Sequence, residues 1–249
     1  RRRLTRYISV TGVQTCALPI LPLLGAVAVL ATYGLCVLFG SRSAGVVASA
    51  LLATSPVFLF QVVQPMSDVA VTAWWALALV LACAPLRGAP LVAGLVTSLA
   101  VATRPNLLPM AILPAVLCAR GRQEPGGAAR AVWFGIGLLP GVVGVFWLQA
   151  RLFGSAFSSG YGSVSDLYSM ASIGPNAAAY ARRIVHGEPA ALTLLLLALL
   201  ASVFRTRGDA AVPLATPSRA PRVRTAVWLA AAALGVMLAS YLPSHCPHF

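Results

Sequence analysis

Long apolar runs without a charged residue dominate this sequence and constrain its fold more than any other feature. About 20 apolar residues in helical conformation are needed to cross the hydrocarbon core of a bilayer. The runs are continuous rather than alternating and are rich in Ala and Leu, which favours helices over strands. We therefore predict an all-α, polytopic transmembrane helical bundle with about eight hydrophobic segments, over 21–39, 44–62, 69–86, 89–103, 107–119, 131–150, 189–204 and 225–243.

The composition supports a lipid environment. Hydrophobic residues make up 59% of the 249 residues and charged residues only 9%, whereas about 25% are charged in a typical soluble domain. The net charge of +13 comes from arginines, because the sequence has no lysine. These arginines lie singly or in small clusters between apolar runs, which fits the positive-inside rule better than nucleic-acid binding. We expect the lipid bilayer as a partner and no nucleic acid.

The arginines between the runs also predict an orientation. If the run at 21–39 ends in the cytoplasm, the inside loops hold ten arginines and the outside loops four. The positive-inside rule favours this choice. The runs at 89–103 and 107–119 are short and are separated by Arg104-Pro105-Asn106. They form either two short spans or a re-entrant pair.

Two hydrophilic stretches connect the later runs. Residues 205–224, rich in Arg and Pro, are predicted to be a cytoplasmic loop near anionic lipid. Residues 151–188 are predicted to lie outside and to contain a short helix from Pro175 to His186. Tyr180 and Ile184 fall on one face of this helix, which suits a position in the membrane interface.

The two ends of the sequence differ in character from the apolar body. Residues 10–20, VTGVQTCALPI, resemble the in-frame translation of a sequencing adapter. We therefore interpret 1–20 as artefact and 21–243 as the transmembrane domain of a fragment. The arginine-rich start is otherwise typical of a signal peptide. The end, 244–249, breaks off after an apolar run, as a truncated or frameshifted end would.

Acidic residues are scarce, so each one is a candidate for function. Asp68 follows Gln64-Pro65-Met66-Ser67 in a short outside turn before the run at 69–86. As a structural residue, Asp68 or Ser67 would cap the helix by accepting a backbone N–H. As a functional residue, the Asp68 carboxylate would position a polar substrate at the membrane surface. The two roles are compatible.

Arg104 is the candidate cation. An arginine at membrane depth costs about 2.5–3.5 kcal/mol on insertion scales and often marks a functional site. A guanidinium suits phosphate because it can donate two parallel hydrogen bonds. Arg104, with Asn106 beside it, is therefore predicted to contact a lipid phosphate; the alternative is a loop arginine that reaches the interface.

The outside loop supplies the remaining candidates for substrate binding. Aromatic and carboxylate side chains suit the faces and hydroxyls of sugars, and arginines suit phosphate. The alternative is an ordinary solvated loop. The candidates are Tyr161, Asp166, Arg182 and Arg183.

The sequence predicts neither a metal site nor a disulfide framework. Its five cysteines form no CxxC or Cys/His pattern. No nucleotide-binding, zinc-protease or serine-hydrolase motif is present. We therefore predict no metal ligand and no certain cofactor.

Three segments carry a resemblance to a known family. They are ATSPVFLFQVVQPMSDVAVTAWWALAL at 53–79, AVATRPNLLPMA at 100–111 and SGYGSVSDLY at 159–168. Their order resembles that in the C-type glycosyltransferase superfamily, in its family 39-like, polyprenyl-phosphate-dependent (mannosyltransferase-like) members. The resemblance covers about 21–243, and each motif is moderately specific.

The resemblance implies an enzyme that moves a sugar from a polyprenyl-phosphate donor to an acceptor on the outer face of a bacterial plasma membrane. It also implies a catalytic aspartate in an outside loop before residue 21, which helps to place a divalent metal in some members. No catalytic residue is therefore assigned here, and the fragment alone is expected to be inactive. The rival hypotheses are a multi-spanning transporter or flippase, and a membrane component without catalytic activity.

Overall fold

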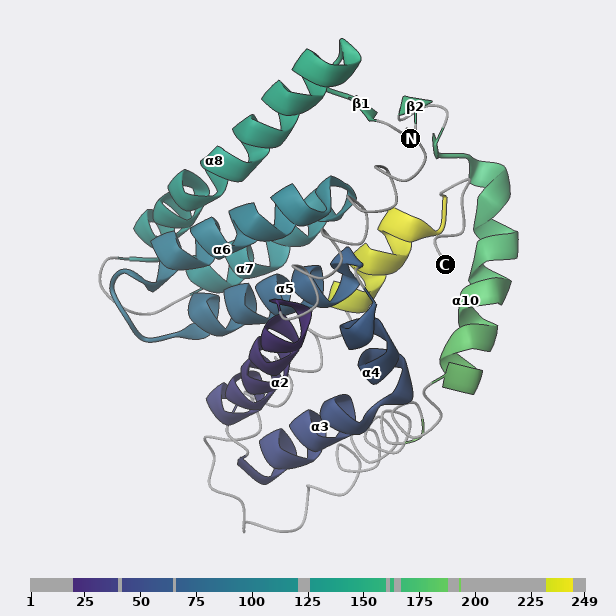
Figure 1. The fold of residues 1–249 in the computed structure, drawn as a ribbon. Coiled ribbons are helices and arrows are strands. Elements are labelled where there is room, and N and C mark those ends of the chain that lie inside the picture. Colours follow the sequence, from purple (N-terminus) through teal and green to yellow (C-terminus); the bar gives the residue numbers. More distant parts are fainter. Residues whose placement is uncertain are drawn as a thin grey trace, which may run out of the picture.

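The computed structural model describes residues 20–39, 42–64, 66–120, 126–159, 162–163, 167–187, 193 and 232–243. This part of the chain is helical apart from one minimal hairpin, so the all-α prediction is confirmed for it (Figure 1). The helices are α2 (Ile20–Leu38), α3 (Arg42–Thr54), α4 (Pro56–Val63), α5 (Ser67–Cys83), α6 (Ala89–Thr103), η1 (Pro105–Ala111), α7 (Ile112–Ala119), α8 (Gly127–Phe153), η2 (Met170–Ser172), α10 (Ile173–Gly187) and a helix at Ala232–Tyr241; the hairpin pairs β1 (Ser158–Ser159) with β2 (Gly162–Ser163).

Several sequence predictions fall outside the described residues. These are the adapter-like segment up to residue 19, the run at 189–204 apart from Thr193, the loop at 205–224 and the end at 244–249. They stay predictions. The short helix predicted from Pro175 to His186 is confirmed, because α10 covers it.

The prediction of eight membrane segments is confirmed only in part. Two of the described helices, α2 and α8, are long and apolar enough to cross a membrane. The α3–α4 pair would be a third if it forms one span, although it bends by 57°. The other described runs are helical but shorter, at Ser67–Cys83, Ala89–Thr103, Pro105–Ala119 and Ala232–Tyr241.

The bend between α3 and α4 follows from two residues. Pro56 has no N–H to donate back into α3, so it suits the first position of a new helix. Ser55 caps that new helix, since its Oγ accepts the N–H of Phe58 at 3.1 Å. The single run predicted at 44–62 is therefore broken in its middle.

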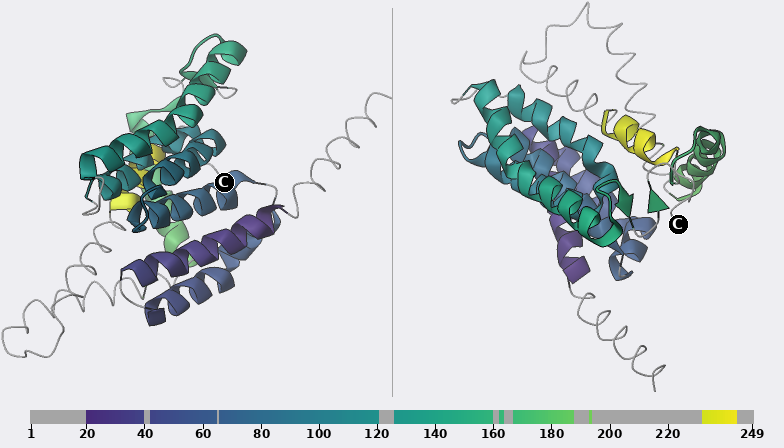
Figure 2. Two further views of the ribbon diagram at one scale, coloured as in Figure 1. Left: turned by 90° about the vertical axis from the view of Figure 1, so that its left-hand side faces the viewer. Right: turned by 90° about the horizontal axis from the view of Figure 1, so that it is seen from above.

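Glycine and serine let α6 and α8 approach closely. A Cβ on Gly94 would come within 2.9 Å of the Gly137 Cα atom, and one on Gly141 would meet Ser98. Helix pairs in lipid associate through such small residues, because the apolar solvent gives little hydrophobic driving force between helices. The two helices lie side by side in Figures 1 and 2.

The segment after α6 returns to the end of the bundle where α6 began. One buried cluster near Arg104 contains Trp75, Ala100 and Met110. A second joins Cys118, on α7, to Ala93, near the start of α6. The pair formed by α6 and η1–α7 thus runs the length of α5 and does not turn back midway. Both members of this pair are apolar helices shorter than α2 and α8.

A buried arginine closes the other end of the bundle. Arg130, in the first turns of α8, is 2% exposed and donates to the carbonyls of Ala84 and Leu86, each at 3.4 Å. These carbonyls follow α5, where a positive charge also complements the helix dipole. The contact joins the loop that holds Arg87 to the start of α8. The sequence predicted that both lie on the same side of the membrane.

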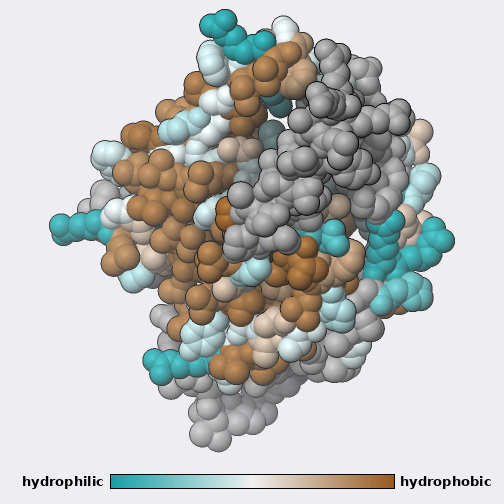
Figure 3. Space-filling view, in the orientation of Figure 1, coloured by the Kyte–Doolittle hydropathy of each residue, from teal (hydrophilic) through white to brown (hydrophobic). Residues whose placement is uncertain are grey.

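Hydrophobic side chains face outward over much of the described surface. Figure 3 shows them across the face formed by the helical bundle, with hydrophilic side chains at its margins. Exposed large residues include Trp133, Ile136, Val143 and Trp147 on α8. Trp147 also stacks with Arg151, whose guanidinium carbon lies 5.6 Å from the ring centroid. Such a surface suits lipid as its solvent.

Gly137→Val should destabilise the bundle, because the new side chain would strike the backbone of Leu91 and Leu95 on α6. Forcing extra atoms into a packed site costs about 1–3 kcal/mol. Thermal unfolding in detergent would measure the loss. Gly135→Val is the matched control on the same helix, since nothing lies within 4 Å of a Cβ there. Equal unfolding temperatures for the two variants would refute the proposed packing.

Candidate functional site

Arg104 lies at the turn between α6 and η1 and is held by three polar side chains. Pro105 disfavours helical backbone at the residue before it, and Arg104 is accordingly extended, with φ −143° and ψ 94°. Its Nη2 lies 2.7 Å from Asp68 Oδ1. Its Nε donates to Ser67 Oγ at 2.9 Å, and its Nη1 donates to Tyr241 Oη at 3.0 Å. The structure therefore brings two predicted site residues, Asp68 and Arg104, into direct contact.

The predicted helix-capping role of Asp68 or Ser67 is wrong. Helix α5 begins at Ser67, its capping position is Met66, and no side chain makes a capping hydrogen bond there. Ser67 and Asp68 bind Arg104 instead. Asp68 still lies in the first turn of α5, where a negative charge is favourable.

A cavity of about 850 Å³, partly open to the surface, adjoins this cluster. Its walls come from α2, α4, α5, η1, α10 and the helix Ala232–Tyr241. The polar lining residues are Gln61, Ser67, Asp68, Thr72, Arg104, Tyr180, Arg183 and Tyr241, and the others are Leu35, Met66, Val71, Trp75, Ala76, Leu79, Leu107, Met110, Leu234, Met237 and Leu238. The cavity thus joins a charged cluster to a largely apolar interior, which suits an amphipathic ligand.

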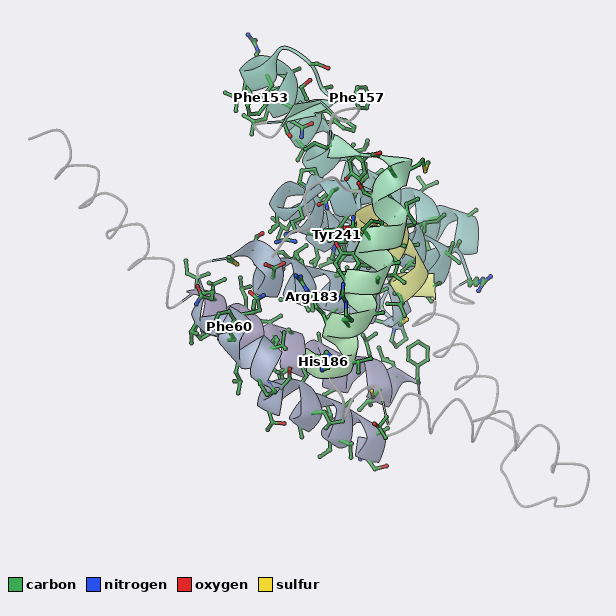
Figure 4. The ribbon with its side chains drawn as sticks, turned by 90° about the vertical axis from the view of Figure 1, so that its right-hand side faces the viewer. Phe60, Phe153, Phe157, Arg183, His186 and Tyr241 are labelled. Carbon is green, nitrogen blue, oxygen red and sulfur yellow. The ribbon has the colours of Figure 1, made fainter. Side chains whose placement is uncertain are left out.

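Helix α10 brings one of its two arginines to the cavity. Arg183 lines it together with Tyr180. Both arginines are exposed, but Arg182 does not line the cavity, and its Nε donates to the Ala178 carbonyl at 3.3 Å. Figure 4 shows Arg183 on α10 and Tyr241 on the neighbouring helix. The structure therefore separates two adjacent candidates that the sequence treated alike.

Two hydrogen bonds tie the α10 region to the chain after Tyr241. Asn176 Nδ2 donates to the Leu242 carbonyl at 2.8 Å. The N–H of Ser169 donates to the Pro243 carbonyl at 2.7 Å. Because Tyr241 binds Arg104, these bonds connect the segment from Ser169 to Asn176 with the charged cluster.

The structure adds no support for the other predicted site residues. Asn106 is half-buried in η1 but does not line it. Tyr161 and Asp166 lie outside the described residues. No group of three or more His, Cys, Asp or Glu that could hold a metal ion occurs in the described part of the chain.

Tyr241 and Trp75 are among the residues of the site that the sequence did not predict. Tyr241 contacts Arg104 across 137 positions of sequence. Trp75 is 5% exposed, and its side chain lines the cavity. The predicted orientation could have pointed to Tyr241, because it put the end of the run at 225–243 on the same side of the membrane as Asp68 and Arg104.

The charges of the cluster favour an anionic ligand. Asp68 offsets the charge of Arg104, and Arg183 adds a second guanidinium to the lining. A guanidinium has five N–H donors, and the three contacts of Arg104 use three of them. Two N–H groups therefore remain for oxygen atoms of a ligand. Comparison with protein-family models, with curated proteins and with solved structures found no match to this chain.

Tyr241→Phe should destabilise the protein by about 1 kcal/mol, because it removes an acceptor from a charged donor that is partly exposed to water. Denaturant unfolding in detergent would measure the change. Tyr33→Phe, on α2, is the matched control and should change stability by less than about 0.5 kcal/mol. In an Arg104→Gln background the effect of Tyr241→Phe should shrink; an undiminished effect would mean that the hydroxyl acts independently of Arg104.

Tyr168 predicts a dependence of stability on pH. Burial raises the pKa of Tyr168 above its ordinary value of 10.0, and the nearby Tyr241 raises this pKa further. The folded state thus favours the neutral phenol, and this contribution is complete below about pH 10 and is lost as the pH rises through the raised pKa. Unfolding midpoints should fall less steeply above about pH 10 in Tyr168→Phe than in the wild type. Parallel curves would contradict the effect.

Proposed function

We propose that this chain is part of a membrane glycosyltransferase that takes a sugar from a polyprenyl-phosphate donor on the outer face of a bacterial plasma membrane. The observation that supports it best is the Arg104 cluster at a largely apolar cavity, with Arg183 in the same lining. A lipid phosphate has the matching chemistry, since it combines an anionic head with an apolar chain. The sequence resemblance points to the same ligand.

The cluster suits recognition of a phosphate because its geometry is set before a ligand binds. Asp68, Ser67 and Tyr241 fix the guanidinium plane of Arg104 from three sides. Only 23% of the Arg104 side chain is exposed, and charge interactions strengthen where water is partly excluded. A preorganised guanidinium loses less entropy on binding than a flexible one.

In sugar transfer, the leaving group is the lipid phosphate, and its negative charge would develop next to these arginines. An acceptor hydroxyl attacks the anomeric carbon of the sugar, and the bond from that carbon to the phosphate oxygen breaks. The electron pair leaves with the phosphate, whose growing negative charge Arg104 and Arg183 stabilise. A general base takes the proton of the acceptor; the resemblance puts that base before residue 21, so Asp68 is a positioning residue here.

The described helices offer less support to a transporter or flippase. Such proteins place polar or charged groups near the membrane midplane. Asp68 and Arg151 instead lie in the first and last turns of their helices, and Arg130 lies close to the start of α8. We therefore keep the transferase as the proposed function.

Arg104→Ala should weaken the binding of undecaprenyl phosphate by about ten- to a hundredfold, because hydrogen bonds to charged groups contribute about 1.5–3 kcal/mol. Arg104→Lys should weaken it less, since the charge remains while the paired donors are lost. Arg183→Ala should also weaken binding. Native mass spectrometry of the purified chain in detergent would measure each dissociation constant.

Arg182→Ala is the matched control, because it removes the same charge from the neighbouring position on α10, which does not line the cavity. Wild-type affinity in both the Arg104 and Arg183 variants would refute the phosphate site. Equal losses in the Arg182 and Arg183 variants would show a general charge effect. The resemblance implies a catalytic base before residue 21, so sugar transfer should be assayed with a longer form that supplies such a loop. Absence of sugar transfer by that form would contradict the enzyme.

A further inference from the structure

The cavity changes from polar to apolar along α5. Its lining on this helix begins at Ser67 and Asp68, which bind Arg104, and includes Val71 and Thr72 one turn later. Beyond Thr72 the lining residues of α5 are Trp75, Ala76 and Leu79. The positions from Ser67 to Leu79 cover about 18 Å of helix axis at 1.5 Å per residue.

The helix Ala232–Tyr241 forms a second wall, whose lining also changes from polar to apolar. On the helix Ala232–Tyr241, Tyr241 contacts Arg104, and the other lining residues are Leu238, Met237 and Leu234. These side chains lie progressively further from the charged cluster along the helix. Two walls from distant parts of the sequence therefore share one direction, with a polar end and an apolar interior.

The size of the cavity limits how much of a lipid it can hold. At about 30 Å³ for each water-sized group, the volume of about 850 Å³ takes about 28 non-hydrogen atoms. A phosphate and each isoprene unit have about five such atoms, so a phosphate with about four isoprene units fits. With carbon–carbon bonds of about 1.5 Å, four extended units also span close to the length of the lined part of α5.

We propose that the cavity binds the phosphate and only the first four or so isoprene units of the lipid, and that the rest of a polyprenyl chain lies outside it among bilayer lipids. This inference rests on the proposed function, which supplies the lipid phosphate as ligand. It adds a specificity: the affinity depends on the first isoprene units of the lipid and not on the total length of its polyprenyl chain.

The test compares prenyl phosphates of increasing length on the purified chain in detergent. Geranylgeranyl phosphate, with four isoprene units, should bind within about threefold of undecaprenyl phosphate, because both fill the cavity equally. Geranyl phosphate, with two units, should bind at least about tenfold more weakly, because it leaves the apolar interior uncontacted. Native mass spectrometry would give the dissociation constants.

Leu79→Trp places a large side chain at the apolar part of the lining furthest from Ser67 on α5. It should weaken geranylgeranyl phosphate and leave geranyl phosphate unchanged, because only the longer chain reaches that depth. Leu139→Trp adds the same side chain on the exposed face of α8. This control should bind both lipids as the wild type does.

The outcomes separate the inference from the proposed function. Much tighter binding of undecaprenyl than of geranylgeranyl phosphate would overturn the inference and leave the function standing. Equal binding of the geranyl and geranylgeranyl lipids, or no effect of Leu79→Trp on the longer one, would also overturn it. Failure of the wild type to bind undecaprenyl phosphate would instead remove the proposed function, and the inference with it.

Discussion

The guanidinium of Arg104 joins parts of the chain that are far apart in sequence. It lies at the turn after α6 and contacts the start of α5 through Ser67 and Asp68, and the helix Ala232–Tyr241 through Tyr241. A charge taken out of water is costly unless it is paired and hydrogen-bonded. Arg104 therefore holds three parts of the chain close together. They are the turn after α6, the start of α5 and the end of the helix Ala232–Tyr241.

At the opposite end of the bundle, a second arginine is removed from water but is paired differently. Arg130 is almost fully buried and has carbonyl oxygens rather than a carboxylate as its partners. Between the two arginines, α6 and α8 approach each other through Gly94 and Gly137. Charged contacts thus fix the ends of the described bundle, and small residues allow close packing between them.

The positions of the helices could be predicted from the sequence because each depends on a local run of apolar residues. The candidates Asp68 and Arg104 could also be found, since charges are scarce in such a chain. Their pairing could not, because periodicity carries no information on contacts between distant segments such as Arg104 and Tyr241. Helix lengths were overestimated where Pro56 breaks a continuous apolar run. The capping role failed because α5 begins at Ser67, which places Ser67 and Asp68 inside the helix and Met66 at the capping position.

The two arginines of the cavity divide the task of recognising an anion. Asp68 already offsets Arg104, so this pair fixes direction: it presents N–H donors in a set plane and adds little net charge. Arg183 supplies the second guanidinium from α10, a helix linked to the cluster through Asn176 and the backbone after Tyr241. Such a division lets a ligand be attracted by one arginine and oriented by the other.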